Sequence, residues 1–180
     1  MKKKISILGL TGSIGQSIFE IIKKKKNYFK VILLSSNKNF SVICKQIKRY
    51  KPKYFVIRNL KVFNKVKKKF KKSKVKLIGS FEFKNLKIKS DIVISAIPGI
   101  AGLEPTINVI GSSKKILIAN KESIICGWNL IKRIAKKNKT KIIPVDSEHF
   151  SITQLIKDSK MNEIEKIFLT ASGGPFLNLK

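Results

Sequence analysis

Residues 5–15 read Ile-Ser-Ile-Leu-Gly-Leu-Thr-Gly-Ser-Ile-Gly, an apolar run followed by closely spaced glycines. The apolar run is typical of a buried β-strand, and the segment 13–26 has isoleucines at helical spacing. One face of that helix would carry Ile14, Ile18, Ile21 and Ile22. A strand that passes through glycines into a helix predicts a phosphate-binding loop, because backbone amides and the helix N-terminus can approach an anion there.

The glycines of this loop, Gly9, Gly12 and Gly15, have the spacing G-x-x-G-x-x-G, whereas the commoner dinucleotide pattern is G-x-G-x-x-G. Thr11 and Ser13 add hydroxyl donors to the loop. The simpler alternative is a tight turn that holds no ligand. We favour a dinucleotide site, because the glycines, the preceding strand and the following helix all coincide.

Strand-like β-branched runs alternate with segments of helical period along most of the chain. The runs are residues 5–9, 31–35, 54–57, 75–78, 91–96, 115–119, 141–145 and 167–171. Several contain consecutive apolar residues, as expected for a sheet that is covered on both faces. The alternation predicts an α/β fold with a doubly wound, mostly parallel Rossmann-like sheet, whose ligands lie at the carboxyl ends of the strands.

The chain carries 40 basic and 10 acidic residues, a formal charge of +30 at pH 7. Only Arg49, Arg58 and Arg133 are arginines, and the lysines are scattered along the whole chain. A nucleic-acid surface usually uses Arg as well and concentrates its charge on one face. We therefore interpret the lysines as a coding bias at solvent-exposed positions and not as a nucleic-acid surface. A basic nucleic-acid-binding module remains the alternative.

The two cysteines, Cys44 and Cys126, lie in predicted helices and lack the spacing of a zinc site or a disulfide framework. This usage favours a reducing, cytoplasmic location. The apolar run 5–10 is too short for a secretory signal, and no stretch has the length needed to cross a bilayer. We therefore expect no membrane partner.

The end of the second predicted strand indicates which dinucleotide the loop prefers. In NAD sites a carboxylate there accepts from the ribose 2′-hydroxyl, but this chain has Asn37, Lys38 and Asn39 after two serines. Without a carboxylate to repel a 2′-phosphate, and with a lysine to bind one, the loop favours NADP(H). An ordinary polar loop with an incidental lysine is the alternative.

Carboxylates are scarce in this chain, yet two short polar stretches at predicted strand ends contain three of them. Glu122 follows Asn120 and Lys121, and Asp146 is separated from Glu148 only by Ser147. In an extended segment Asp146 and Glu148 would point the same way and could share Mg²⁺ or Mn²⁺ with a third ligand. The alternative is a helix N-cap with a carboxylate in the first turn, and the default for His149 is a packed surface residue.

Four motifs in register resemble those of the 1-deoxy-D-xylulose 5-phosphate reductoisomerase family. They are Gly-x-Thr-Gly-Ser-Ile-Gly from Gly9, Asn-Lys-Glu-Ser from Asn120, Val-Asp-Ser-Glu-His from Val145 and Leu-Thr-x-Ser-Gly-Gly-Pro-Phe from Leu169. The likeness runs from Lys4 to Phe176 and includes the stretch 96–103. The family commonly has Gly where this chain has Asn37, a residue that tolerates left-handed backbone angles.

The resemblance implies the conversion of 1-deoxy-D-xylulose 5-phosphate into 2-C-methyl-D-erythritol 4-phosphate, a step of non-mevalonate isoprenoid synthesis. It implies NADPH and a divalent cation, Mg²⁺ or Mn²⁺ with Co²⁺ as a further option. The implied cofactor-binding residues are Gly9, Thr11, Gly12, Ser13, Ile14, Gly15, Asn37, Lys38, Asn39, Asn120 and Glu122. The implied metal ligands are Asp146 and Glu148, the catalytic residues Lys121 and Glu148, and the substrate contacts Lys121, Ser147, Glu148 and Ser172.

Family members are more than twice as long as these 180 residues and form homodimers. We expect residues 1–145 to form an NADPH-binding Rossmann-like domain and residues 146–180 to begin an α+β catalytic domain. Because the resemblance places a lid, a third metal ligand and a helical domain beyond this sequence, we expect weak or no turnover by this chain alone. Another NADP-dependent oxidoreductase and a non-catalytic NADPH-binding remnant are the remaining alternatives.

Overall fold

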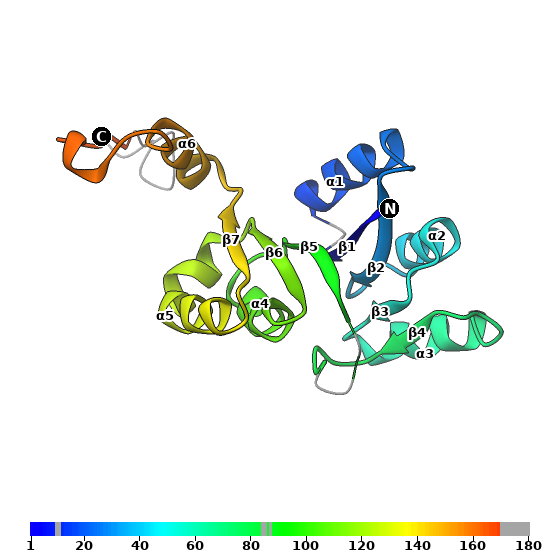
Figure 1. Cartoon of the computed structure of the whole chain (residues 1–180). Helices are drawn as coiled ribbons and strands as arrows, with labels where there is room; N and C mark the ends of the chain where they lie inside the picture. The colour runs from blue at the N-terminus through cyan, green and yellow to red at the C-terminus, as the bar shows by residue number, and fades with distance from the viewer. Residues whose placement is uncertain (10–11, 84–85, 87, 170–180) are drawn as a thin grey trace, which may run out of the picture.

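The computed structural model of the chain describes residues 1–9, 12–83, 86 and 88–169. Seven parallel strands form one sheet in the order β4-β3-β2-β1-β5-β6-β7 (Figure 1). The strands are β1 (Lys3–Leu8), β2 (Phe29–Ser35), β3 (Tyr54–Val56), β4 (Lys76–Ile78), β5 (Ser90–Ser95), β6 (Ser113–Ile118) and β7 (Lys141–Pro144). The doubly wound parallel sheet predicted from the sequence is confirmed. Its strand order reverses between β1 and β5, which makes that boundary the switch point where such sheets bind ligands.

Among the described residues, five α-helices connect strands: α1 (Ser13–Lys24), α2 (Phe40–Tyr50), α3 (Leu60–Lys69), α4 (Leu103–Ile110) and α5 (Lys121–Lys137). A sixth helix, α6 (Ser147–Leu155), follows β7. Two short 3-10 helices cover Ile100–Gly102 and Met161–Glu163. Cys44 in α2 is buried and Cys126 in α5 is exposed, and both are free thiols. None of the helices in the described ranges has the length and apolar character required to cross a membrane.

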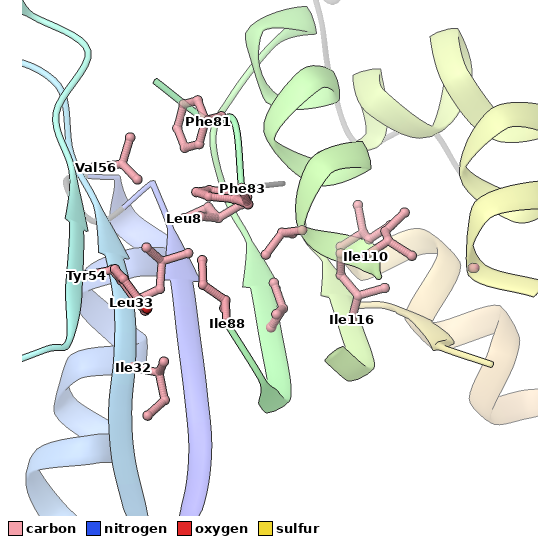
Figure 2. Close-up of a cluster of buried hydrophobic side chains, with 14 of the residues drawn as sticks. Leu8, Ile32, Leu33, Tyr54, Val56, Phe81, Phe83, Ile88, Ile110 and Ile116 are labelled. Carbon is pink, nitrogen blue, oxygen red and sulfur yellow. The ribbon is translucent and has the colours of Figure 1, made fainter. Parts of the chain in front are cut away.

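The core has two parts, one on each face of the sheet. On one face α1, α2 and α3 contribute Phe19, Ile43 and Val66 to a cluster with the strands. On the other face α4 and α5 pack against the sheet together with Phe81 and Phe83, which precede β5 (Figure 2). Burial on both faces explains why the strands consist of consecutive apolar residues.

The buried face of α1 differs from the predicted one. Ile14 and Ile21 are 40% and 54% exposed, whereas Phe19 and Ile22 are buried. Gly15, Phe19 and Ile22 are spaced four and three residues apart and form the buried stripe. The helix turns this way because the large apolar surface of Phe19 gains more from burial than that of an isoleucine at the helix edge.

The predicted strand 167–171 is wrong in the part that the structure describes. Residues 167–169 are outside any strand, and Ile167 and Phe168 are 52% and 87% exposed. No strand within the described ranges lies beside them to provide hydrogen-bond partners, and a lone β-branched run does not form a sheet. Residues 170 and 171 lie outside the described residues.

The segment after β7 is set apart from the sheet. Figure 1 places α6 beyond the end of β7, and no residue from 147 to 169 is buried. A segment that buries no side chain contributes little to the core of the preceding domain. This arrangement suits a boundary near residue 145, which stays a prediction.

Candidate functional site

A cleft of about 450 Å³ lies at the carboxyl ends of β1, β5, β6 and β7. It is lined by Gly12, Ile14, Ala96, Pro98, Ala119, Asn120, Lys121, Glu122, Val145, Asp146, Ser147 and Glu148. The fold therefore brings together the predicted glycine loop and both predicted polar stretches, although more than 130 residues separate Gly12 from Glu148. Gly9, Gly15, Asn37, Lys38 and Asn39 are not among the lining residues. Thr11, Ser172 and the side chain of Ser13 lie outside what the structure describes.

Gly9 lets the end of β1 approach the end of β5. Its φ of +86° is in the left-handed region, and a Cβ at this position would overlap the carbonyl group of Ala96. The Gly9 amide also donates a 3.0 Å hydrogen bond to Ser35 Oγ in β2. Only glycine fits this position, so Gly9 shapes the floor of the loop and is itself not exposed to the cleft.

Gly12 presents an open helix N-terminus to the cleft. It caps α1 with extended backbone, and a Cβ built on it would meet no atom within 4 Å. Gly12 has no side chain that could accept from the first-turn N–H groups, and the first turn of α1 contains no acidic residue. Since the described cap residue leaves the first-turn N–H groups uncapped, these groups and the positive end of the helix dipole can receive an anion.

The loop after β2 has a structural role in addition to its predicted one. The Asn39 side chain caps α2 by accepting a 3.0 Å hydrogen bond from the Val42 amide. Asn37 and Lys38 are exposed. Asn39 is thus committed to the helix start, and Lys38 is the residue of this loop whose cationic group is free to contact a phosphate.

Asn120 connects the end of β6 to the loop after β5. Its side chain caps α5 by accepting a 3.0 Å hydrogen bond from the Ser123 amide. Its Nδ2 group donates to the carbonyl oxygens of Ile97 and Gly99, the latter at 2.8 Å. Asn120 is 3% exposed, so it fixes the wall of the cleft through these three bonds.

Lys121 and Glu122 form the exposed first turn of α5 and line the cleft. A carboxylate in the first turn is favoured by the helix dipole, which gives Glu122 a structural explanation. Lys121 is the opposite case, because a cation at a helix N-terminus is disfavoured by the dipole. Its charge adds to that of the helix end and makes this side of the cleft attractive to an anion.

Asp146 and Glu148 mark the start of α6. Asp146 caps the helix and accepts hydrogen bonds from the His149 amide at 3.1 Å and from His149 Nδ1 at 2.7 Å. Burial raises the pKa of Asp146, but the hydrogen bonds from His149 outweigh it, so the pKa lies below its ordinary value of 3.8. The carboxylate is therefore ionised at neutral pH and available to a cation.

The expectation that residues 146–148 are extended is wrong, because the helix begins at Ser147 and Glu148 lies in its first turn. The N-cap alternative holds for Asp146, yet both carboxylates still line the cleft. Their oxygen atoms suit Mg²⁺ or Mn²⁺. Within the described residues no group of three His, Cys, Asp or Glu side chains could hold a metal ion. The two carboxylates thus supply part of a coordination set.

The sequence did not indicate Ala96, Pro98 and Val145 as residues of the cleft wall. Gly99, with a φ of +69°, and Gly102 shape the loop behind them. A Cβ at Gly102 would overlap the Asn120 side chain, so this glycine permits the hydrogen bonds of Asn120. The Pro98-Gly99 pair, which begins two residues after the predicted strand 91–96, was the available signal for this wall.

The parallel sheet, the glycine loop and the cleft at the switch point place the chain among the Rossmann-like α/β proteins. The sequence model described as 1-deoxy-D-xylulose 5-phosphate reductoisomerase matches residues 5–127, and that of the C-terminal domain of the same enzyme matches residues 142–180. The chain belongs to the 1-deoxy-D-xylulose 5-phosphate reductoisomerase family. This confirms the resemblance found in the sequence motifs.

Among its relatives, the 1-deoxy-D-xylulose 5-phosphate reductoisomerase of Pelagibacter ubique is 49% identical over 98% of this chain and 47% of that protein. The solved enzyme from Zymomonas mobilis in complex with NADPH is 31% identical with a TM-score of 0.88, over 99% of this chain and 48% of its own. A DOX-P reductoisomerase in complex with NADPH, fosmidomycin and magnesium is 28% identical with a TM-score of 0.84, over 99% and 47%. The chain spans about half the length of these relatives.

Proposed function

We propose that this chain is the cofactor-binding part and the first segment of the catalytic part of a reductoisomerase. The reaction is the NADPH- and divalent-metal-dependent conversion of 1-deoxy-D-xylulose 5-phosphate into 2-C-methyl-D-erythritol 4-phosphate, in cytoplasmic isoprenoid precursor synthesis. The observation that carries the proposal is the cleft, which collects Gly12, Lys121, Asp146 and Glu148 in a chain of this family. Residues 1–145 are the proposed NADPH domain.

The first turn of α1 binds the NADPH pyrophosphate in this proposal. Support comes from the open space at Gly12 and the absence of a first-turn acid, which leave the amide groups free for an anion. Lys38, exposed after β2, contacts the adenosine 2′-phosphate. Asn120 and Glu122 lie toward the nicotinamide end of the cofactor. Asn120 holds the cleft wall there through its hydrogen bonds, and Glu122 lies in the exposed first turn of α5.

Asp146 and Glu148 hold Mg²⁺ or Mn²⁺ together with a ligand from outside the described residues. Support comes from the ionised state of Asp146 and from the position of both carboxylates on the cleft wall. When bound, the metal acts as a Lewis acid toward the ketone and hydroxyl oxygens of the substrate. His149 fixes the orientation of Asp146 through its ring nitrogen.

Lys121 and Ser147, which both line the cleft, contact the substrate in this proposal, and Ser172 contacts its phosphate. Lys121 stabilises negative charge that develops on the substrate oxygens, since its ammonium group and the α5 N-terminus act at the same point. Lys121 and Glu148 are the proposed catalytic residues. The sugar phosphate is thus held between the cofactor loop and the start of α6.

The complete reaction needs groups that the described residues do not supply. Two carboxylates leave the metal site incomplete within the described ranges. We therefore expect little NADPH oxidation by the 180-residue chain with substrate and Mg²⁺. Fast oxidation would show that this chain alone completes the site. Assembly as a homodimer is also part of the proposal.

Calorimetric titration with Mn²⁺ tests the metal site directly. The wild-type chain should bind one equivalent weakly, and Asp146→Asn and Glu148→Gln should each reduce affinity by about tenfold or more. Asn remains a good helix cap, so Asp146→Asn should preserve α6. The control is Asp158→Asn, which removes an exposed carboxylate that does not line the cleft. Equal binding by all four proteins would contradict the proposed site.

A further inference from the structure

A second, larger groove of about 1280 Å³ lies at the edge of the sheet opposite the cofactor cleft, where the strands begin. Seven lysines line it: Lys4, Lys30, Lys48, Lys51, Lys53, Lys74 and Lys89. No carboxylate is among its lining residues within the described ranges. Because all strands are parallel, this amino edge is separated from the proposed NADPH site by the length of the sheet.

Five of these lysines form a row across five adjacent strands. Lys4 is the second residue of β1 and Lys30 is the second residue of β2. The other three lysines precede β3, β4 and β5 by one or two residues and are Lys53, Lys74 and Lys89. The strand order is β4-β3-β2-β1-β5, so each lysine has its neighbour on the next strand. At about 4.8 Å between strands, the row extends over roughly 20 Å.

The positive charges of the row lysines repel one another in the folded chain. Lys4 and Lys30 are directly opposite each other in the β1–β2 ladder, an arrangement of like charges that disfavours folding. None of the five lysine side chains forms an ion pair among the described residues. The nearby carboxylate of Asp91 accepts from the Lys4 backbone amide and pairs with Lys114 at 3.0 Å.

Helix dipoles do not account for this row. Lys48 and Lys51 stand at the end of α2, where cations complement the negative helix end. The five row lysines lie on strands or shortly before them and outside the last turns of the helices, and the attraction of a helix end falls off within one turn. Coding bias explains why lysine is common in this chain, but not why five adjacent strands begin with exposed lysines around one groove.

We infer that the amino-edge groove binds a linear phosphate polyanion, with inorganic polyphosphate as its ligand class. A row of point charges matches a chain of phosphates, and lysine recognises phosphate without the fixed fork geometry of arginine. Phe70 is the one aromatic residue among the described lining residues, so the groove lacks the stacked aromatic platforms that bind bases. This favours a bare phosphate chain over a nucleic acid.

Calorimetric titration of the 180-residue chain with short-chain inorganic polyphosphate, at several NaCl concentrations, tests this inference. Binding should be saturable and weaken with salt. The variant K30Q/K53Q/K74Q should bind about tenfold more weakly or worse at low salt, with the log–log salt slope reduced by about two. The control K61Q/K65Q/K132Q removes the same charge from exposed positions outside both clefts and should change affinity only about twofold.

Three outcomes would overturn the inference: equal losses in the two triple variants, displacement of polyphosphate by NADPH, or tighter binding of a single-stranded oligonucleotide with the same number of phosphates. The first would reveal a general charge effect, the second a ligand in the cofactor cleft, and the third a nucleic-acid site. A thermal melt excludes misfolding, since K30Q/K53Q/K74Q removes repulsion and should melt no lower than wild type.

Discussion

Gly9 and Gly12 lie three residues apart in one loop, yet only Gly9 is required by the fold, whereas glycine at position 12 is explained by ligand binding. Gly9 has a left-handed backbone and lies against the Ala96 carbonyl, so its constraint comes from folding. Gly12 has ordinary backbone angles, φ −78° and ψ 167°, and faces open space. In our account that space is occupied by the cofactor, so the constraint on Gly12 comes from binding.

Alanine at the two positions should therefore give opposite results. Gly9→Ala should lower the free energy of unfolding by about 2–4 kcal/mol, because a Cβ strains the left-handed backbone and overlaps Ala96. Gly12→Ala should unfold like wild type but bind NADPH about tenfold more weakly. Urea unfolding and NADPH titration of both variants measure this. A stable Gly9→Ala chain, or full NADPH affinity in Gly12→Ala, would contradict the assignment.

Asn120 should be important for the stability of the fold, because its side chain is buried and forms three hydrogen bonds. Asn120→Ala removes three hydrogen bonds and leaves the Ile97 and Gly99 carbonyls without their side-chain donor. We expect a loss of about 2–4 kcal/mol in urea unfolding. The matched control is Asn129→Ala, at an exposed position of the same helix. Similar small losses in both variants would show that Asn120 does not fix the cleft wall.

At the scale of elements, the strands were predictable and the helix faces were less so. Seven of the eight predicted strands exist, because runs such as Ile32 to Leu34 are buried from both sides and leave a continuous apolar signal. The face of α1 was mispredicted because isoleucine spacing alone does not reveal that Phe19 packs on the sheet. The run at Ile167 failed because a strand needs neighbours, which local sequence does not encode.

In the candidate site, too, some features were predictable from the sequence and others were not. Gly12, Lys121, Asp146 and Glu148 were predicted, since each lies within four residues of the end of a strand and parallel strands end at one edge. Asn120 was predicted as a cofactor-binding residue, but its structural role was not, because its bonds to Ile97 and Gly99 join residues 23 and 21 positions apart. Such contacts depend on how the loops meet in space.

Asp91 connects the starts of β1, β5 and β6 and should make stability depend on pH. The Lys4 backbone amide and then the Lys114 ammonium group hold the pKa of Asp91 below its ordinary value of 3.8. Its contribution is present above that value and is lost as the pH falls through the lowered pKa. Asp91→Asn should reduce stability at pH 7 by less than about 1 kcal/mol, since the side chain is partly exposed.

The measurement for Asp91 is urea unfolding of wild type and Asp91→Asn from pH 7 down to acid. The difference between them should shrink as the pH falls below the ordinary aspartate value. Asp158→Asn, outside the sheet, serves as the control for loss of a carboxylate. A difference that stays constant or grows in acid would show that the ionised Asp91 carboxylate does not stabilise the fold.

The helix α6 should be dispensable for the fold. None of residues 147–169 is buried, so a chain that ends at Val145 loses none of the described core side chains. We expect the shortened chain to unfold cooperatively, with a thermal midpoint within about 3 °C of the full chain. It should also lose Mn²⁺ binding, because Asp146 and Glu148 are gone. A collapse of cooperative unfolding would place the domain boundary elsewhere.

Across the whole molecule, the sheet separates two kinds of charge. The cofactor cleft at the carboxyl edge contains Glu122, Asp146 and Glu148, whereas the groove at the amino edge is lined by lysines and no carboxylate among the described residues. The net charge of +30 raises the question whether any anion would bind simply because it is an anion. Salt distinguishes the two cases, since general attraction is screened while backbone amides at a helix end retain their geometry.

The central claim is that the carboxyl-edge cleft binds NADPH. Its most direct test is a fluorescence titration of the 180-residue chain with NADPH and with NADH, each at low and at high NaCl. Our account predicts saturable binding that prefers NADPH and persists at high salt, because amide groups of α1 hold the pyrophosphate and Lys38 meets the 2′-phosphate. No saturable binding by a chain shown to be folded, or NADH binding as tight as NADPH, would contradict it.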